Sequence, residues 1–295
     1  MKEKELKEGL PEDSSQGIDR RGFLSAAGAF GATALIHSSA ENLFAAEKKI
    51  PAKGPSSKEK KEWPVESIDW QKGFYEQKQL TSHGILVKAP KNVHPMALKK
   101  AAFIVEKMLE NADPEIIERL SPTKLEDAKD VSQIAIIPAG SSLADLPEFK
   151  WLKGKLDINR VPYEKVRGAG AVPGQPVSAT SEENLMGYPT DAHKMWNVTC
   201  HEFGHAIERR AFTEEQHKIW DACFAQNRNK WGNVPGDFLR QMPDNHEYWA
   251  KLTQVYFQAN DVGNPFLIQQ LDPAAYRFLE SVYNAKKPQP KKGRR

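Results

Sequence analysis

The pattern of apolar and polar positions predicts a mostly helical folded body. Apolar side chains in residues 96–111 recur at helical spacing, which indicates an amphipathic helix. Asp113 and Pro114 are typical of a helix N-terminus, and this second, short helix is expected to end at residue 120. The same periodicity predicts helices over residues 214–227, 246–258 and 273–283.

Short apolar runs predict a small sheet beside these helices. Residues 84–88 and 132–137 have the composition of buried strands, and Pro138 ends the second. Residues 177–180 follow a Gly- and Pro-rich stretch and are the candidate for an edge strand that holds an extended peptide by main-chain pairing; an ordinary connecting loop is the alternative. The elements together predict an α+β fold, helix-rich, with a small mixed sheet.

Residues 196–210 contain the most specific chemical pattern, His-Glu-x-x-His, within a predicted helix. His201 and His205 are four positions apart and share a face, so both imidazoles can point at one metal ion. Glu202 lies about 100° round the helix, beside such an ion, where a general base belongs. Gly204 is a poor helix former, and its presence indicates close packing.

A catalytic zinc site needs three protein ligands and one open position, so two histidines alone do not define one. A third histidine at the metzincin spacing would fall at Ala211, which excludes that arrangement. Glu247 stands 42 positions after His205, near the start of a predicted helix, from which its carboxylate can reach the first helix. An ordinary solvated carboxylate is the alternative for Glu247.

The net positive charge of the chain is concentrated in its last ten residues. The 295 residues carry a formal charge of +3, but residues 286–295 alone carry six basic groups and no acidic one. The body between the ends is therefore nearly neutral, which argues against nucleic-acid binding as the main function. Residues 286–295 are expected to be a basic, disordered tail.

The N-terminal residues 1–40 are predicted to be an export signal. Arg20, Arg21, Phe23 and Leu24 match the twin-arginine pattern, and the apolar run that follows is too short to span a bilayer. A cytosolic amphipathic helix is the alternative. We expect export to the periplasm or the exterior of a bacterium, without stable membrane insertion. Residues 41–66 are expected to be a flexible linker, and residues 67–285 the folded domain.

The two cysteines, Cys200 and Cys223, give neither a disulfide framework nor a Cys-rich zinc module. A single bridge after export and a pair of buried thiols are both open. Four other histidines lack partners at ligand spacing and are expected to be structural or exposed: His83, His94, His193 and His217.

The two helix patterns together resemble a known family. HEFGHAIE, which begins at His201, and the later NHEYWAKLTQVYFQAND are similar to the gluzincin-type domain of the anthrax lethal factor-like metallopeptidases, especially their bacterial relatives. Weaker similarities extend the resemblance over residues 80–283. It implies a zincin-like fold with Zn²⁺ as cofactor. It also implies that His201, His205 and Glu247 are zinc ligands and Glu202 the catalytic base.

The chain departs from this family in three ways. In NHEYWA a single residue, His246, separates Asn245 from Glu247, where the family's pattern has two. Relatives often carry a Tyr seven positions before the Glu ligand, where its hydroxyl can stabilise the oxyanion; here that position is Arg240. A guanidinium can do the same electrostatic work, and His246, Tyr188 and Tyr248 are alternatives. Lys251 stands where some relatives have a second Glu.

Ligand histidines usually donate their second N–H to a carboxylate or carbonyl. The acids in suitable places are Glu183, Asp191 and Asp244.

The sequence therefore predicts an exported zinc metallopeptidase that acts on a peptide or protein substrate. The metal would activate water, and Glu202 would take the proton from that water and return it to the leaving amine. One alternative is a zinc-containing envelope protein that has lost catalysis, which the missing Tyr favours. Another is a zinc hydrolase of a non-peptide amide, such as a cell-wall cross-link.

Overall fold

The computed structural model of the protein describes residues 73–121, 131–157, 160–172, 174–194, 196–234, 242–261 and 263–285. All of them belong to one compact unit, Gly54–Arg295. Residues 1–40, 41–66 and 286–295, for which a signal, a linker and a tail are predicted, lie outside the described residues. Arg240 does too. These assignments stay predictions.

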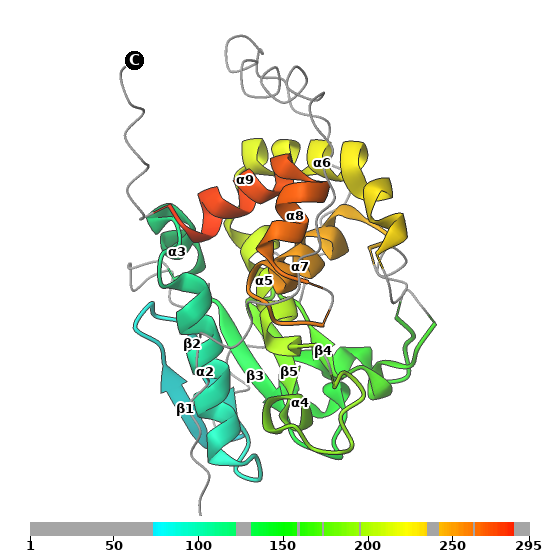
Figure 1. The fold of residues 1–295 in the computed structure, drawn as a ribbon. Helices are drawn as coiled ribbons and strands as arrows, with labels where there is room; N and C mark the ends of the chain where they lie inside the picture. The colour runs from blue at the N-terminus through cyan, green and yellow to red at the C-terminus, as the bar shows by residue number, and fades with distance from the viewer. Residues whose placement is uncertain are drawn as a thin grey trace, which may run out of the picture. The chain divides into compact units, whose positions relative to one another are not determined.

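The described elements form an α+β fold, which confirms the predicted class (Figure 1). The strands are β1 (Gln77–Leu80), β2 (Leu86–Ala89), β3 (Gln133–Ile137), β4 (Gly168–Ala169) and β5 (Val177–Ser181). The α-helices are α2 (Pro95–Leu109), α3 (Pro114–Leu120), α4 (Glu182–Met186), α5 (Val198–Ala211), α6 (Glu214–Asn227), α7 (Asn245–Tyr256), α8 (Pro265–Leu271) and α9 (Pro273–Tyr283). Short 3₁₀ helices are η3 (Leu143–Asp145), η4 (Pro147–Leu152), η5 (Tyr163–Lys165) and η6 (Arg228–Asn233).

The sheet is small and mixed, with strand order β1-β2-β3-β5-β4. β2, β3 and β5 run parallel, and β1 and β4 pair antiparallel at its two edges. The prediction that residues 177–180 form an edge strand is wrong, because β5 pairs on both sides: Ala179 lies opposite Ala135 of β3 and Ala169 of β4. The true edge, β4, has two residues in a Gly-rich stretch, too few to show a periodic pattern.

Helix α5 lies between the sheet and the helices that follow it in the chain (Figure 1). Asn197 caps it, accepting from the Cys200 N–H at 2.9 Å, and Phe203 and Ile207 are fully buried. α7 packs directly on α5 at Gly204, as predicted. The Trp249 indole donates to the Gly204 carbonyl at 2.8 Å, and a Cβ on Gly204 would touch Thr253 at 3.4 Å.

Helix caps agree closely with the sequence. Asp113 accepts from the Glu115 N–H at 2.9 Å and begins α3 as predicted. α6 and α9 have the predicted bounds, and α2 and α7 agree within one or two residues. Several short elements were not expected: β1, β4, α4, α8 and the 3₁₀ helices. In β1 exposed and half-buried positions alternate over a polar stretch, so no apolar period marks it.

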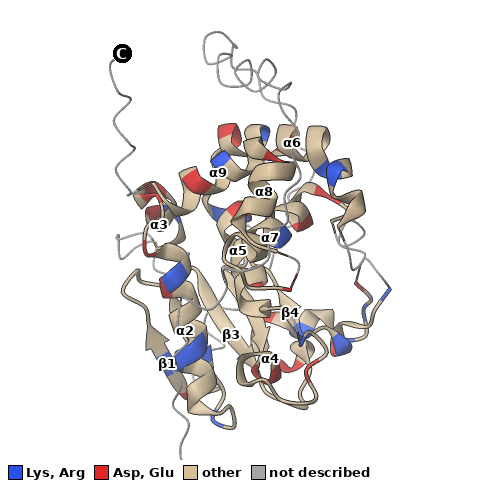
Figure 2. Cartoon of the chain, in the orientation of Figure 1, with Lys and Arg blue, Asp and Glu red and all other residues tan. Residues whose placement is uncertain are grey.

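Cys200 and Cys223 are free and buried, in line with the interpretation as two thiols. Basic and acidic positions are interspersed along α2, α6 and α9 (Figure 2). Among the described helices, none is both long and apolar enough to cross a membrane.

Candidate metal centre

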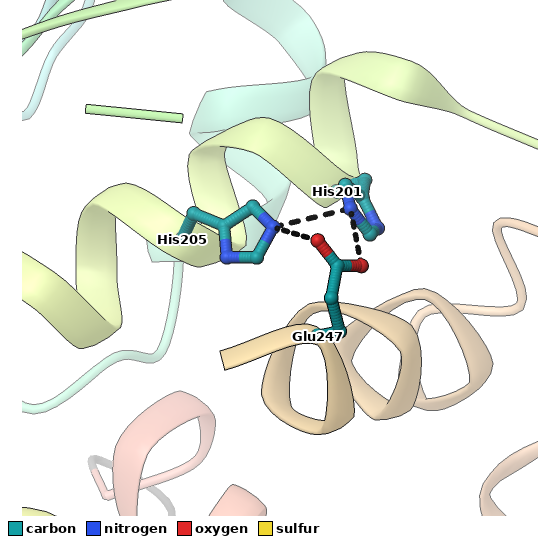
Figure 3. A group of neighbouring side chains, drawn as sticks. All are labelled: His201, His205 and Glu247. Carbon is teal, nitrogen blue, oxygen red and sulfur yellow. Dashed lines mark hydrogen bonds and ion pairs between the residues drawn. The ribbon is translucent and has the colours of Figure 1, made fainter. Parts of the chain in front are cut away.

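Three side chains from two helices converge at one point (Figure 3). α5 contributes His201 and His205, one turn apart, and α7 contributes Glu247 from its first turn. The two Nε2 atoms lie 3.2 Å apart. One Glu247 oxygen lies 3.3 Å from His201 Nε2, and the other 3.3 Å from His205 Nε2. The structure thus brings together the three residues that the sequence singled out.

The dimensions of this triangle fit a zinc ion. Tetrahedral ligands about 2.0–2.1 Å from one zinc lie about 3.3–3.4 Å from one another. The separation of the two Nε2 atoms, 3.2 Å, matches that edge length. Each Nε2 also has a different Glu247 oxygen 3.3 Å away, so the carboxylate faces both imidazoles. Two neutral imidazoles and one carboxylate are also a donor set found in catalytic zinc sites. The residues therefore fit the metal that the sequence predicts.

Local structure holds the ligands in ionisation states suited to a metal. Burial lowers the pKa of His205 to about 4, which keeps its imidazole neutral. Burial alone would raise the pKa of Glu247, but hydrogen bonds from His201 and His205 hold it well below its usual range. Glu247 is also fixed by its backbone, because its N–H donates to the cap residue Asp244 at 2.9 Å.

Glu202 lies in the same cleft, next to the histidines but outside their triangle. Burial, and the nearby Glu247 carboxylate, raise the pKa of Glu202 to about 7, although the neighbouring His201 opposes the shift. The side chain is thus placed beside the candidate metal rather than on it, as the helical geometry predicts for a base.

Two glycines next to β4 make room for these side chains. A Cβ on Gly168 would lie 2.7 Å from Val198 Cγ1 and would also collide with the Glu202 carboxylate. A Cβ on Gly170 would lie 2.5 Å from the Cβ of His205. No role was predicted from the sequence for this Arg-Gly-Ala-Gly stretch, which begins at Arg167. Its signal is the pair of glycines two positions apart, which permits close backbone approach.

The predicted partners of the ligand histidines are elsewhere, so this prediction is wrong. Glu183 forms an ion pair with Arg167 at 2.5 Å, and Asp191 accepts from Asn184 at 2.8 Å. Asp244 caps α7. Each of these acids has a closer partner than an imidazole: the Arg167 guanidinium, the Asn184 amide or a backbone N–H of α7. Within the described part of the structure, the Nδ1 atoms of His201 and His205 are buried without a hydrogen-bond partner.

The candidates for oxyanion stabilisation are mostly occupied. The Tyr248 hydroxyl is buried and donates to Asp272 at 2.6 Å, so it faces away from the site. His246 Nδ1 lies 2.9 Å from the buried Glu208 carboxylate. Tyr188 is not among the residues that line the cavities at His201. Arg240 lies outside the described residues.

Two cavities meet at the candidate metal centre and share His201, Glu202, Glu247 and Gly168. The first, which we call the aromatic-side cavity, has a volume of about 300 Å³, and its walls include Phe149, Trp151 and Tyr163. The second, the α7-side cavity, has a volume of about 360 Å³, and its walls include Trp196, His193, Lys251 and Gln254. The centre therefore lies in a cleft with two chemically different sides.

Two residues of the α7-side cavity were not predicted as site residues. His193 was expected to be structural or exposed, yet it is partly buried in the wall of this cavity, and burial lowers its pKa. Lys251 was noted only as a departure from the family. Its position one turn after Glu247 on α7 was the available signal, because residues four apart share a helix face.

The remaining predicted histidines have local roles. His83 Nδ1 lies 3.0 Å from Glu106, His94 caps α2, and His217 Nδ1 lies 3.2 Å from Glu208. These three are structural or exposed, as expected.

No model of a known protein family matches the sequence, and no curated protein matches it. Among solved structures, the chain is similar to the PRO-PRO endopeptidase PPEP-2 from Paenibacillus alvei. The sequence identity is 19% and the TM-score 0.46, with 65% of this chain and 95% of that chain covered. A likeness of this degree carries no argument, and the lethal factor-like family stays a resemblance. The case for a function comes from this chain's own side chains.

Proposed function

We propose that the protein is a zinc-dependent metallopeptidase that hydrolyses peptide bonds. The observation that carries the proposal is the convergence of His201, His205 and Glu247: the two Nε2 atoms lie 3.2 Å apart, and each has one of the two Glu247 oxygens 3.3 Å away. These three residues would hold the ion. Zinc, when bound, supplies Lewis acidity that activates water and polarises the peptide carbonyl.

Glu202 would act as the general base. Its carboxylate lines both cavities beside the ligand histidines, so it can accept a proton from the attacking water and return it to the leaving amine. Gly168 gives its carboxylate space. Arg240 remains our proposal for stabilising the oxyanion, on the resemblance alone.

The sheet edge beside the metal helix supports a peptide as the substrate. Gly168 and Ala169 pair with β5 on one side only, and Gly168 lines both cavities. The other side of β4 carries main-chain groups with which an extended peptide can pair. The cleft then continues on both sides of the candidate metal, as an endopeptidase requires.

The direct test compares the parent chain with Glu202→Gln. After zinc loading, both should contain metal, but Glu202→Gln should hydrolyse a peptide library at least about 10²-fold more slowly, the usual worth of a general base. A chelator should abolish the parent's activity. Equal cleavage by both proteins would refute the role of Glu202. A metal-filled parent with no turnover on any peptide would instead favour a zinc-containing binding protein.

A further inference from the structure

We propose that Lys251 binds a carboxylate of the substrate, so that the α7-side cavity selects peptides that present an acidic side chain or a free C-terminus there. This inference rests on the proposed function and adds a substrate preference to it. Lys251 is a buried residue that nevertheless lines a cavity. Its residue exposure is 6%, and it stands in the wall of the cavity that also contains Glu202 and Glu247.

The ammonium group of Lys251 has no polar partner among the described residues. The recorded contact of its Nζ is with the face of Trp196, 3.6 Å from the ring centroid. That contact is favourable, but an aromatic face replaces none of the three hydrogen-bond acceptors that an ammonium can use. Because Lys251 lines the cavity, a ligand there that supplies such acceptors would gain charge-assisted hydrogen bonds from the ammonium.

The other cationic side chains of this cavity are less suited to the role. Arg167 is committed: it pairs with Glu183 and donates to the carbonyls of Ser141 and Pro138. Lys165 is exposed to solvent. Within the described part of the cavity, Lys251 is therefore the cation that is both buried and uncommitted.

A second atom in the same wall also lacks a partner. Gln254 lies one turn after Lys251 on α7 and is 1% exposed. Its Nε2 donates to the Asn197 carbonyl at 3.0 Å, which fixes the orientation of the amide because a carbonyl can only accept. Its Oε1 is buried without a hydrogen-bond partner in the described residues. The wall thus offers one charged donor and one acceptor, a pair that suits a carboxylate and a nearby peptide N–H.

The charges around the site favour an anion over a cation. Once Glu247 and Glu202 serve as ligand and base, their two negative charges are balanced by a divalent zinc ion. Of the other charged residues in the wall, Asp157 offsets Lys165, and Arg167 is paired with Glu183, so Lys251 leaves an excess positive charge. A structural alternative is that Lys251 only neutralises these two acids. A lysine with that role would be held in an ion pair, and the described residues give Lys251 none within 4.0 Å.

The experiment uses matched peptides and two readouts. The first kind of pair has Glu in one peptide and Gln in the other, and one such pair is made for each position around the cleaved bond. The second kind of pair has a free C-terminus in one peptide and a C-terminal amide in the other. Hydrolysis is measured for the parent, Lys251→Met and Lys251→Arg. Binding of uncleaved peptides is measured by calorimetry on zinc-loaded Glu202→Gln, with and without Lys251→Met. Lys107→Met, which removes an exposed lysine on α2, is the matched control.

We expect the parent to prefer the carboxylate member of one pair by about 10- to 100-fold, the worth of a hydrogen bond to a charged group. The pair that shows the preference tells an acidic side chain from a C-terminus. In Lys251→Met the preference for the carboxylate peptide over its neutral partner should fall close to one, both in hydrolysis and in binding. Lys251→Arg should keep part of this preference, and Lys107→Met should keep all of it. Lys251→Gln replaces Lys251→Met if the latter does not fold.

Equal cleavage of both members by the parent, or a preference that survives Lys251→Met, would overturn the inference. Failure of the proposed function looks different: the zinc-loaded parent would then cleave neither member. The binding readout still decides on Lys251 in that case, because tighter binding of the carboxylate peptide that disappears in Lys251→Met supports the inference without any turnover.

Discussion

Two buried lysines in this protein have similar burial but opposite surroundings. Lys88, on β2, is fully buried, and burial lowers its pKa to about 8. Its ammonium donates to Glu148 at 2.6 Å and to Gln133 at 2.7 Å, and Tyr75 donates to the same Glu148 carboxylate at 2.5 Å. Burial lowers the pKa of Lys251 to about 8 as well, yet Lys251 faces a cavity and has an aromatic ring for its partner.

The comparison separates a structural polar cluster from a functional one. Burial and a shifted pKa are the same in both lysines, so neither property identifies a site by itself. The difference lies in hydrogen bonding. The Lys88 cluster is satisfied within the protein, whereas the candidate metal centre has several buried polar atoms without partners in the described residues, among them both Nδ1 atoms. The Nδ1 atoms belong to rings whose Nε2 atoms face the candidate metal, and Gln254 Oε1 belongs to the wall of the α7-side cavity, where a ligand can pair with it.

The largest expected effect is on stability at the paired lysine. Lys88→Met should cost about 3–5 kcal/mol in free energy of unfolding, because it leaves the Glu148 carboxylate buried without its cation. Lys251→Met should cost less than about 1 kcal/mol, since no ion pair is broken. Urea denaturation of the two variants measures the difference. Equal losses in free energy of unfolding would show that Lys251 is paired within the protein as firmly as Lys88.

Zinc should stabilise the unpaired cluster by a similar amount. A ligand that binds only the folded state at about 1,000 times its Kd adds about 4 kcal/mol. We expect a matching rise in Tm when zinc is added to metal-free protein, and no rise in His205→Ala, which lacks one ligand. Lys88→Met keeps all three ligands, so zinc should raise its Tm by the same amount as in the parent, although its metal-free Tm is lower. The same rise in His205→Ala would place the binding site elsewhere.

The cluster around Glu208 is intermediate between the paired Lys88 cluster and the candidate metal centre. It is fully buried on α5, with its carboxylate 2.9 Å from His246 Nδ1 and 3.2 Å from His217 Nδ1. Glu208→Gln removes the charge that holds both imidazoles, and we expect a loss of about 1–3 kcal/mol in urea denaturation. Glu214→Gln, in the first turn of α6, is the matched control. A loss no larger than that of the control would mean that this cluster does not tie α5 to α6 and α7.

The smallest effect belongs to a surface cluster. Glu106 is half-buried, and burial alone would raise its pKa, but hydrogen bonds from Ser82 and the nearby His83 together lower it. A carboxyl whose pKa is lower in the folded state stabilises the protein above its unfolded pKa and loses this effect as the pH falls. Glu106→Gln should therefore cost at most about 1 kcal/mol at neutral pH. The cost should shrink as the pH falls below about 4.3, where the carboxyl becomes protonated in the unfolded chain, and vanish below its lowered pKa in the folded protein. A cost that does not change with pH would contradict this.

Much of the helical frame was predictable because its signals are local. Caps such as Asp113 and the spacing of apolar residues set the bounds of α3, α6 and α9 within the sequence itself. The convergence of His201, His205 and Glu247 was predictable for a related reason. Two of them share a helix face, and the third belongs to a pattern that the family resemblance singled out.

The rest of the site depended on tertiary contacts that no local pattern records. β4 has two residues and is defined by its pairing with β5. The acids Glu183, Asp191 and Asp244 have the composition expected of partners to the ligand histidines, but each finds a nearer group. The burial of Lys251 beside Trp196 depends on how α7 packs near the segment before α5, which its sequence neighbours do not reveal.

The metal content of the purified protein tests the central claim most directly. Measured by mass spectrometry of metals after removal of loosely bound ions, the parent chain and Glu202→Gln should each contain one zinc per chain, and His205→Ala should contain none. A parent without zinc, or a His205→Ala variant that keeps a full equivalent, would contradict the claim that His201, His205 and Glu247 form a metal site.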